Sequence, residues 1–154
     1  MRRRIFVVPL VLLLAALLLT TGCGGGREDE ELVCKDYAEW TDALGYTPNT
    51  PAYIPMAEHS EVYVVEPGKV AKVIYEGEGQ RIVYRMVQEA DRELIRLDDY
   101  EVVGESTCKG FSVPLYGDAE GVHMAQWSED GKTFALYFEQ AVTVEQGDQQ
   151  IMYS

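Results

Sequence analysis

The chain has 154 residues, with 13 lysines and arginines, 26 aspartates and glutamates and a formal net charge of −13. This length predicts one compact domain, and the acidic balance argues against nucleic acid or anionic lipid heads as partners, because both need a basic surface. A hydrophobic fraction of 47% excludes wholesale disorder.

Residues 1–22 have the layout of a secretory signal peptide. Three arginines at positions 2–4 precede an apolar run over 5–19, and small polar residues follow. The run is shorter than the roughly 20 residues that span a membrane comfortably. The sequence from Leu19 to Cys23 (LTTGC) resembles the bacterial lipobox, whose cysteine is lipidated and becomes the mature N-terminus.

This lipobox has one departure, because leucine usually stands three residues before the cysteine and Thr20 stands there instead. An ordinary signal peptide or an uncleaved anchor is the alternative. We expect Cys23 to carry an acyl lipid such as palmitate, which would hold the protein on the extracytoplasmic face of the cell membrane.

Residues 23–33 are predicted to be an acidic, flexible tether, because three glycines are followed by the charged run REDEE. Loss of the three arginines with the signal peptide changes the net charge from −13 to −16. Such charge is typical of a solvated surface, and a cationic partner or a metal ion is the alternative.

Two cysteines remain besides Cys23, and an even pair in an exported chain predicts a disulfide between Cys34 and Cys108. The bond would close a loop of about 75 residues. Two free thiols are the alternative. We expect no metal site and no cofactor, because there is no CxxC motif and His59 and His123 are far apart in sequence.

The domain at 34–154 opens with a helix. Asp36 is placed to cap it, Glu39 completes a capping box, and Gly45 ends it. Three prolines between 48 and 55 then predict an extended connection that lays Tyr53 and Ile54 against the core.

After this connection, apolar and polar residues alternate with a period of two, as in β-strands. Glycine-containing turns such as Asp130-Gly131 interrupt the alternation. Residues 89–97 fit a helical turn or a loop, and residues 106–110 a turn that carries Cys108. Residues 143–152 fit a terminal helix. The predicted strands cover 61–66, 70–76, 81–88, 100–105, 111–116, 122–128 and 133–139.

The predicted fold is α+β: an antiparallel, mostly meander sheet of six or seven strands with an N-terminal helix and a short C-terminal helix. Both faces of the 81–88 strand are partly apolar, which predicts cover on each side of the sheet. Lys72, Arg81 and Arg85 are expected to pair with carboxylates across strands, with an anionic ligand as the alternative. The candidate carboxylates are Glu61, Glu66 and Glu101.

An ordered set of short motifs runs along 36–154: PAYIP at 51–55, VIY at 73–75, IVYR at 82–85 and the sequence AQWSEDGKTFAL at 125–136. This set resembles DUF4367, a bacterial extracytoplasmic domain of unknown function found in lipoproteins and in anti-sigma-factor-like proteins. The resemblance implies a sensing or interaction module without known catalytic residues. No sigma-binding module precedes the domain here, so a direct anti-sigma role is not supported.

We therefore expect a monomeric, non-enzymatic binding or envelope-sensing module with a protein, peptide or envelope ligand. The candidate groove, under the proline-rich connection, consists of Tyr53, Ile54, Tyr75, Tyr84, Arg85 and Trp127. A small envelope hydrolase or metal-dependent enzyme is one alternative, although the Gly104–Cys108 sequence lacks the second glycine of a serine nucleophile elbow. A structural spacer without a specific ligand is the other.

Overall fold

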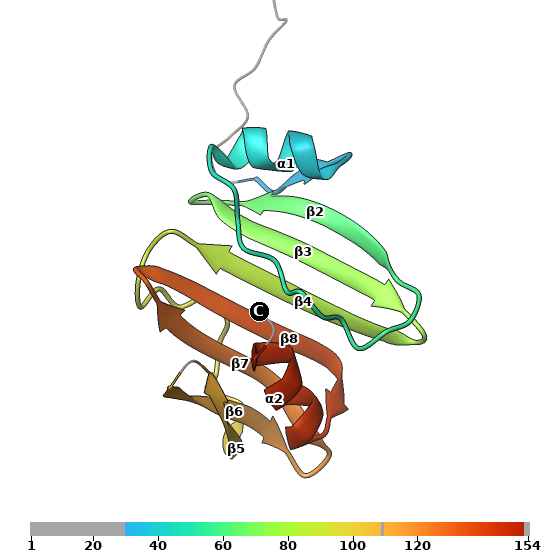
Figure 1. Ribbon diagram of the computed structural model, residues 1–154, viewed down its shortest axis with the longest axis vertical. Helices are drawn as coiled ribbons and strands as arrows, with labels where there is room; N and C mark the ends of the chain where they lie inside the picture. Colours follow the sequence, from blue (N-terminus) through green and yellow to red (C-terminus); the bar gives the residue numbers. More distant parts are fainter. Residues whose placement is uncertain (1–29, 109, 153–154) are drawn as a thin grey trace, which may run out of the picture.

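The computed structural model describes residues 30–108 and 110–152, so the predicted signal peptide, Cys23 and most of the predicted tether lie outside the described residues. Within the described part of the chain, ten elements follow one another (Figure 1). They are β1 (Leu32–Cys34), α1 (Tyr37–Leu44), β2 (Ser60–Glu66), β3 (Val70–Gly77), β4 (Gln80–Val87), β5 (Glu101–Cys108), β6 (Phe111–Asp118), β7 (Gly121–Glu129), β8 (Lys132–Val142) and α2 (Val144–Met152).

The strands of the described residues form one antiparallel sheet in the order β1-β2-β3-β4-β8-β7-β6-β5. The first four strands are one meander and the last four another, and the two halves join where β4 pairs with β8. The predicted α+β class is confirmed, but the predicted count of six or seven strands is wrong, because there are eight. The additional strand is β1, whose three residues are too few to give a period-2 signal.

Helix α1 begins and ends where the sequence predicts. The Asp36 side chain accepts a hydrogen bond from the backbone N–H of Glu39 at 2.9 Å, and Gly45 ends the helix at φ 79°. Trp40 is fully buried, and its Nε1–H donates to the carbonyl of Val64 in β2 at 2.8 Å. This bond ties the helix to the sheet near the β1 edge.

One face of the sheet carries the main core, to which Tyr84, Leu115 and Leu136 contribute fully buried side chains. Helix α2 and the proline-rich connection between α1 and β2 lie on this face (Figure 1). The Tyr84 hydroxyl donates to the carbonyl of Asn49 in this connection at 2.8 Å. Ile54 packs against the core, so the predicted extended connection is confirmed.

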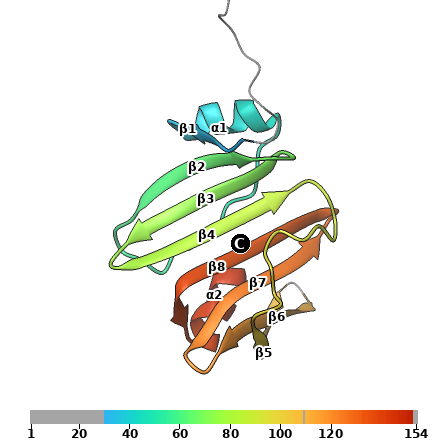
Figure 2. The ribbon, with the colours of Figure 1, turned by 180° about the vertical axis from the view of Figure 1, so that it is seen from behind.

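The opposite face, which Figure 2 shows, carries a smaller apolar cluster of Val64, Ile74 and Val83. The connection from β4 to β5 crosses β8 and β7 on this side. Its Arg92 N–H donates to the hydroxyl of Thr133 in β8 at 3.1 Å. This connection is a loop, one of the two alternatives that the sequence left open for 89–97.

Two other predicted segments differ from the structure. Strand β1 lies partly within the predicted tether at 23–33. Strand β5 continues to Cys108, so the predicted turn over 106–110 is wrong and only two residues separate β5 from β6. The predicted terminal helix at 143–152 is confirmed as α2.

The predicted Cys34–Cys108 disulfide is not formed, since Cys34 is a free, buried thiol. Cys34 ends β1 and Cys108 ends β5, and these strands are the two opposite edges of the sheet. Seven strand spacings place the edges on the order of 30 Å apart, whereas a disulfide needs Cα atoms within about 7 Å. An even cysteine count gave no information on this strand order.

Candidate functional site

The predicted aromatic groove does not form. Tyr75, Tyr84 and Trp127 are buried in the main core, with the fully buried Tyr84 directly under the proline-rich connection. Burial raises the pKa of the Tyr84 hydroxyl, which stays neutral and bonded to Asn49. Of the predicted groove residues, only Tyr53 is substantially exposed, at 43%.

Arg85 points to the other face, because neighbouring side chains in a strand alternate. Its Nε donates to both carboxylate oxygens of Glu66 at 2.9 and 3.1 Å. Lys72, directly opposite Arg85 in the register, pairs with Glu66 at 2.9 Å and with Glu31 at 3.0 Å. The predicted cross-strand pairing with Glu66 is confirmed, and Arg81 pairs with Glu76 rather than with a predicted partner.

The two histidines lie in different parts of the sheet. His59 precedes β2 and lies edge-on to the ring of Tyr75. His123 is in β7, and three strands, β3, β4 and β8, separate β7 from β2. The histidines therefore do not converge in one pocket.

Ser106 is not placed as a nucleophile. Its side chain is fully buried between β5 and α2, and its hydroxyl donates to Asp148 Oδ1 at 2.6 Å. Because a carboxylate only accepts hydrogen bonds, this contact holds the Ser106 proton and ties α2 to β5.

His123 belongs to a second polar group, which we call the turn triad: Asp118, Glu120 and His123. One ligand atom from each lies within 4.8 Å of the others. His123 Nε2 is 3.3 Å from Asp118 Oδ2, and the imidazole ring packs against Tyr100. The sequence analysis does not single out this group, because carboxylates are abundant in the chain. The signal was the compact spacing D-x-E-x-x-H across a turn with Gly121.

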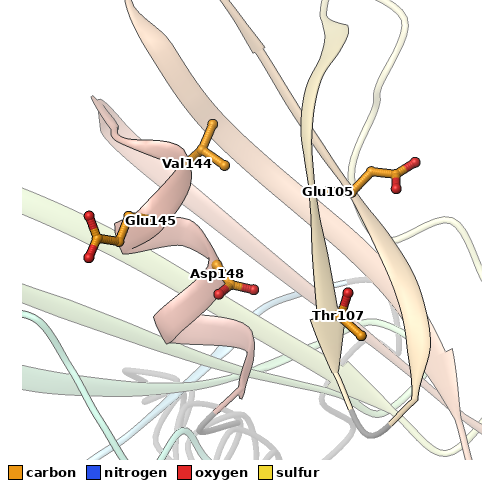
Figure 3. Close-up of a pocket in the computed structure, with 5 residues that line it drawn as sticks. All are labelled: Glu105, Thr107, Val144, Glu145 and Asp148. Atoms are coloured by element: carbon orange, nitrogen blue, oxygen red, sulfur yellow. The ribbon is translucent and has the colours of Figure 1, made fainter.

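The outer edge of β5 is open along the described strand. Strand β5 ends the sheet order, and within the described residues it pairs only with β6. A shallow cavity of about 580 Å³ lies between this strand and α2. Figure 3 shows Asp148 extending from α2 toward β5 and Glu105 pointing away from the helix. The residues that line the cavity are Glu105, Thr107, Val144, Glu145 and Asp148.

Exposed apolar side chains gather beside this cavity. Val102 in β5 is 55% exposed, Val103 is 38% exposed, and Val144 at the start of α2 is 42% exposed. The register shifts between Val102 and Gly104, which marks a β-bulge at Val103. A Cβ at Gly104 would lie 3.0 Å from both methyl groups of Val144, so glycine lets α2 approach the strand closely.

The same edge is acidic. Glu101 and Glu105 on β5 and Glu145 on α2 are exposed. A strand edge offers unpaired backbone donors and acceptors, which an extended segment can bind by adding a strand. With apolar side chains and carboxylates alongside, this edge suits a segment that alternates apolar and basic residues.

Comparison with protein-family models, curated protein sequences and solved structures finds no match to this chain. Among the described residues, no helix has the length and apolar character to cross a membrane.

Proposed function

We propose that this protein is a lipid-anchored extracytoplasmic lipoprotein whose domain is a non-enzymatic binding module, and that it binds an extended basic segment of a protein partner along the β5 edge. The anchor is proposed from the lipobox-like sequence ending at Cys23. The resemblance to DUF4367 stays a prediction, and the binding proposal does not depend on it.

The observation that carries the proposal is the open β5 edge. It extends over eight residues, whereas the other edge, β1, has three. Proteins commonly protect edges by keeping them short or covering them, so a long edge with exposed valines is an exception that needs a reason. Strand addition is the recognition mode that uses such an edge.

Charge selects the class of partner. Glu101, Glu105 and Glu145 border the edge, and the whole chain carries a net charge of −13. A basic segment would place lysines or arginines near one or more of these carboxylates and apolar residues near Val102 or Val144.

A second copy of the chain fits this edge poorly. Pairing two β5 strands would bring both sets of carboxylates, including Glu101 and Glu105, to one seam. Like charges across a strand pair are destabilising, and two chains of −13 also repel at long range. The predicted monomer agrees with this reasoning.

The binding test uses the full chain in detergent and two fluorescent peptides of equal length, one alternating lysine with valine and the other glutamate with valine. We expect saturable binding of the lysine peptide, measured by fluorescence anisotropy, that weakens as salt rises. The double substitution Glu105→Lys and Glu145→Lys should weaken it at least tenfold. Glu58→Lys is the matched control, because Glu58 is exposed but precedes β2 at the other end of the sheet.

Three outcomes would contradict the binding proposal. Equal binding of both peptides would indicate non-specific association. Absence of binding would favour a structural spacer, and self-association of the chain would identify a second copy as the occupant. The anchor is tested separately: Cys23→Ser should release the protein from the membrane fraction and abolish metabolic labelling with palmitate. Unchanged fractionation and labelling would reject lipidation.

A further inference from the structure

The turn triad lies where β6 ends and β7 begins. Asp118 is the last residue of β6, and Glu120 and His123 follow across the turn. His123 is 8% exposed, whereas both carboxylates are exposed. The group therefore has a buried wall formed by the imidazole and an open side formed by the two acids.

The orientation of His123 is set from outside the triad. Its Nδ1 lies 3.3 Å from the carbonyl oxygen of Phe138 in β8. Because a carbonyl oxygen only accepts hydrogen bonds, Nδ1 carries the proton. In the neutral imidazole, Nε2 then bears a lone pair, and this lone pair faces Asp118.

Neither carboxylate can donate to Nε2 when ionised, so neutral His123 presents a buried acceptor without a donor. The contact of 3.3 Å between Nε2 and Asp118 Oδ2 is an ion pair only when the imidazole is protonated, and in the neutral form it joins two acceptors. A cation between the ligand atoms would satisfy these acceptors. The nearby third acceptor, Glu120, favours a cation of more than one charge.

The ligand atoms identify the class of cation. Zinc binds imidazole nitrogen and carboxylate oxygen at about 2.0–2.2 Å in tetrahedral geometry, so neighbouring ligands are about 3.3–3.5 Å apart. The Nε2 to Oδ2 separation of 3.3 Å matches that spacing, and the Glu120 ligand atom lies within 4.8 Å of both. A metal-ligating histidine also usually donates its other N–H to a carbonyl or carboxylate, as His123 does to Phe138. Calcium and magnesium prefer oxygen ligands alone.

We propose that Asp118, Glu120 and His123 form a binding site for a divalent transition-metal ion, with zinc as the best match. Three protein ligands leave a fourth position open to water or to a partner's side chain. This inference is independent of the β5 edge, because none of its ligands lines the cavity between β5 and α2.

The test uses the full chain in detergent, stripped with a chelator and titrated calorimetrically with zinc chloride and then with magnesium chloride. We expect one zinc ion per chain and no saturable magnesium binding at the same concentrations. Glu120→Gln and His123→Gln should each weaken zinc binding at least tenfold. Glu58→Gln is the matched control, since it removes an exposed carboxylate outside the triad and should leave zinc affinity unchanged.

A cobalt titration adds a structural readout, because cobalt in a tetrahedral site absorbs strongly in the visible range. The exposed Glu120 makes Glu120→Gln safe for folding, so its result decides even if His123→Gln unfolds. Absence of saturable zinc binding would overturn the proposal. Equal zinc affinity in the wild type and in Glu120→Gln, or zinc binding weakened equally by Glu58→Gln, would overturn it too.

Discussion

Glu66 holds two cations together on the face opposite the main core, which makes Glu66→Gln a sharp test of that arrangement. Its carboxylate accepts two hydrogen bonds from Arg85 Nε and pairs with Lys72 Nζ at 2.9 Å. The three side chains are only 16%, 20% and 11% exposed, respectively. Removal of the negative charge would leave two opposed, mostly buried cations.

The expected cost follows from this burial. Removal of one partner from a buried ion pair typically costs about 3–5 kcal/mol. Lys72 keeps Glu31 as a second partner at 3.0 Å, and all three side chains retain some solvent contact. We therefore expect Glu66→Gln to lower the free energy of unfolding at pH 7 by about 2 kcal/mol.

The pH dependence has a defined sign. Burial alone would raise the pKa of Glu66, but the hydrogen bonds and charges of Arg85 and Lys72 outweigh it and hold the pKa below the ordinary value. A carboxyl whose pKa is lower in the folded state stabilises fully above its unfolded pKa of about 4.3. This contribution is lost as the pH falls through the folded value. The wild type and Glu66→Gln should therefore converge in stability at acid pH.

Urea unfolding monitored by the fluorescence of the two tryptophans measures both effects, at pH 7 and at acid pH below the folded pKa. Glu76→Gln is the matched control, because Glu76 pairs with Arg81 on the same strands but both side chains are about half exposed. That control should cost less than about 0.5 kcal/mol. Equal costs for the two substitutions, or a Glu66→Gln cost that does not shrink at acid pH, would refute the reasoning.

Three further substitutions or reactions test other parts of the fold. Trp40→Phe should lower the free energy of unfolding by about 2 kcal/mol in urea titrations, because it removes the buried hydrogen bond to the Val64 carbonyl. An unchanged free energy of unfolding would mean that this bond does not anchor α1. Gly117→Ala should lower the free energy of unfolding by about 3 kcal/mol in the same titrations, because its Cβ would lie 1.8 Å from the Gly121 carbonyl oxygen. A free energy of unfolding equal to that of the wild type would contradict this close contact. Cys34 should resist iodoacetamide in the folded protein and react with it in urea without a reductant. The reason is that Cys34 is a buried free thiol whose pKa is raised by burial and by Glu39 and Asp36. Peptide mapping that finds Cys34 labelled only after reduction would restore the disulfide.

The sequence predicts this fold well wherever local chemistry decides. Asp36 and Gly45 place both ends of α1 because caps act within one helical turn. The hairpin turn at Asp130 and Gly131 has positive φ at both positions, 51° and 75°, as the Asp-Gly signal requires. Alternation also assigns the faces of β4 correctly, with Tyr84 in the main core and Val83 in the opposite cluster.

The failed predictions of the disulfide and the groove depend on which strands become neighbours over long sequence separations. The pairing of β4 with β8 places β5 at one edge and leaves β1 at the other. Nothing local to Cys34 or Cys108 encodes that separation. The groove failed for a related reason: Tyr75, Tyr84 and Trp127 share one face, and the proline-rich connection and α2 pack on that face rather than leaving it open.

The two edges created by this topology are unequal, and the inequality supports a binding role for only one of them. β1 has three residues and lies beside α1, whose Trp40 bonds to the next strand, so this edge is short, although Leu32 and Val33 on it are also exposed. β5 has eight residues, a bulge at Val103 and exposed valines that a purely protective edge would replace with charge. Its carboxylates repel other copies of this acidic chain without repelling a basic segment. We expect an edge with these properties to reject self-association and to stay open to a basic partner, which is the combination that a selective strand-addition site requires.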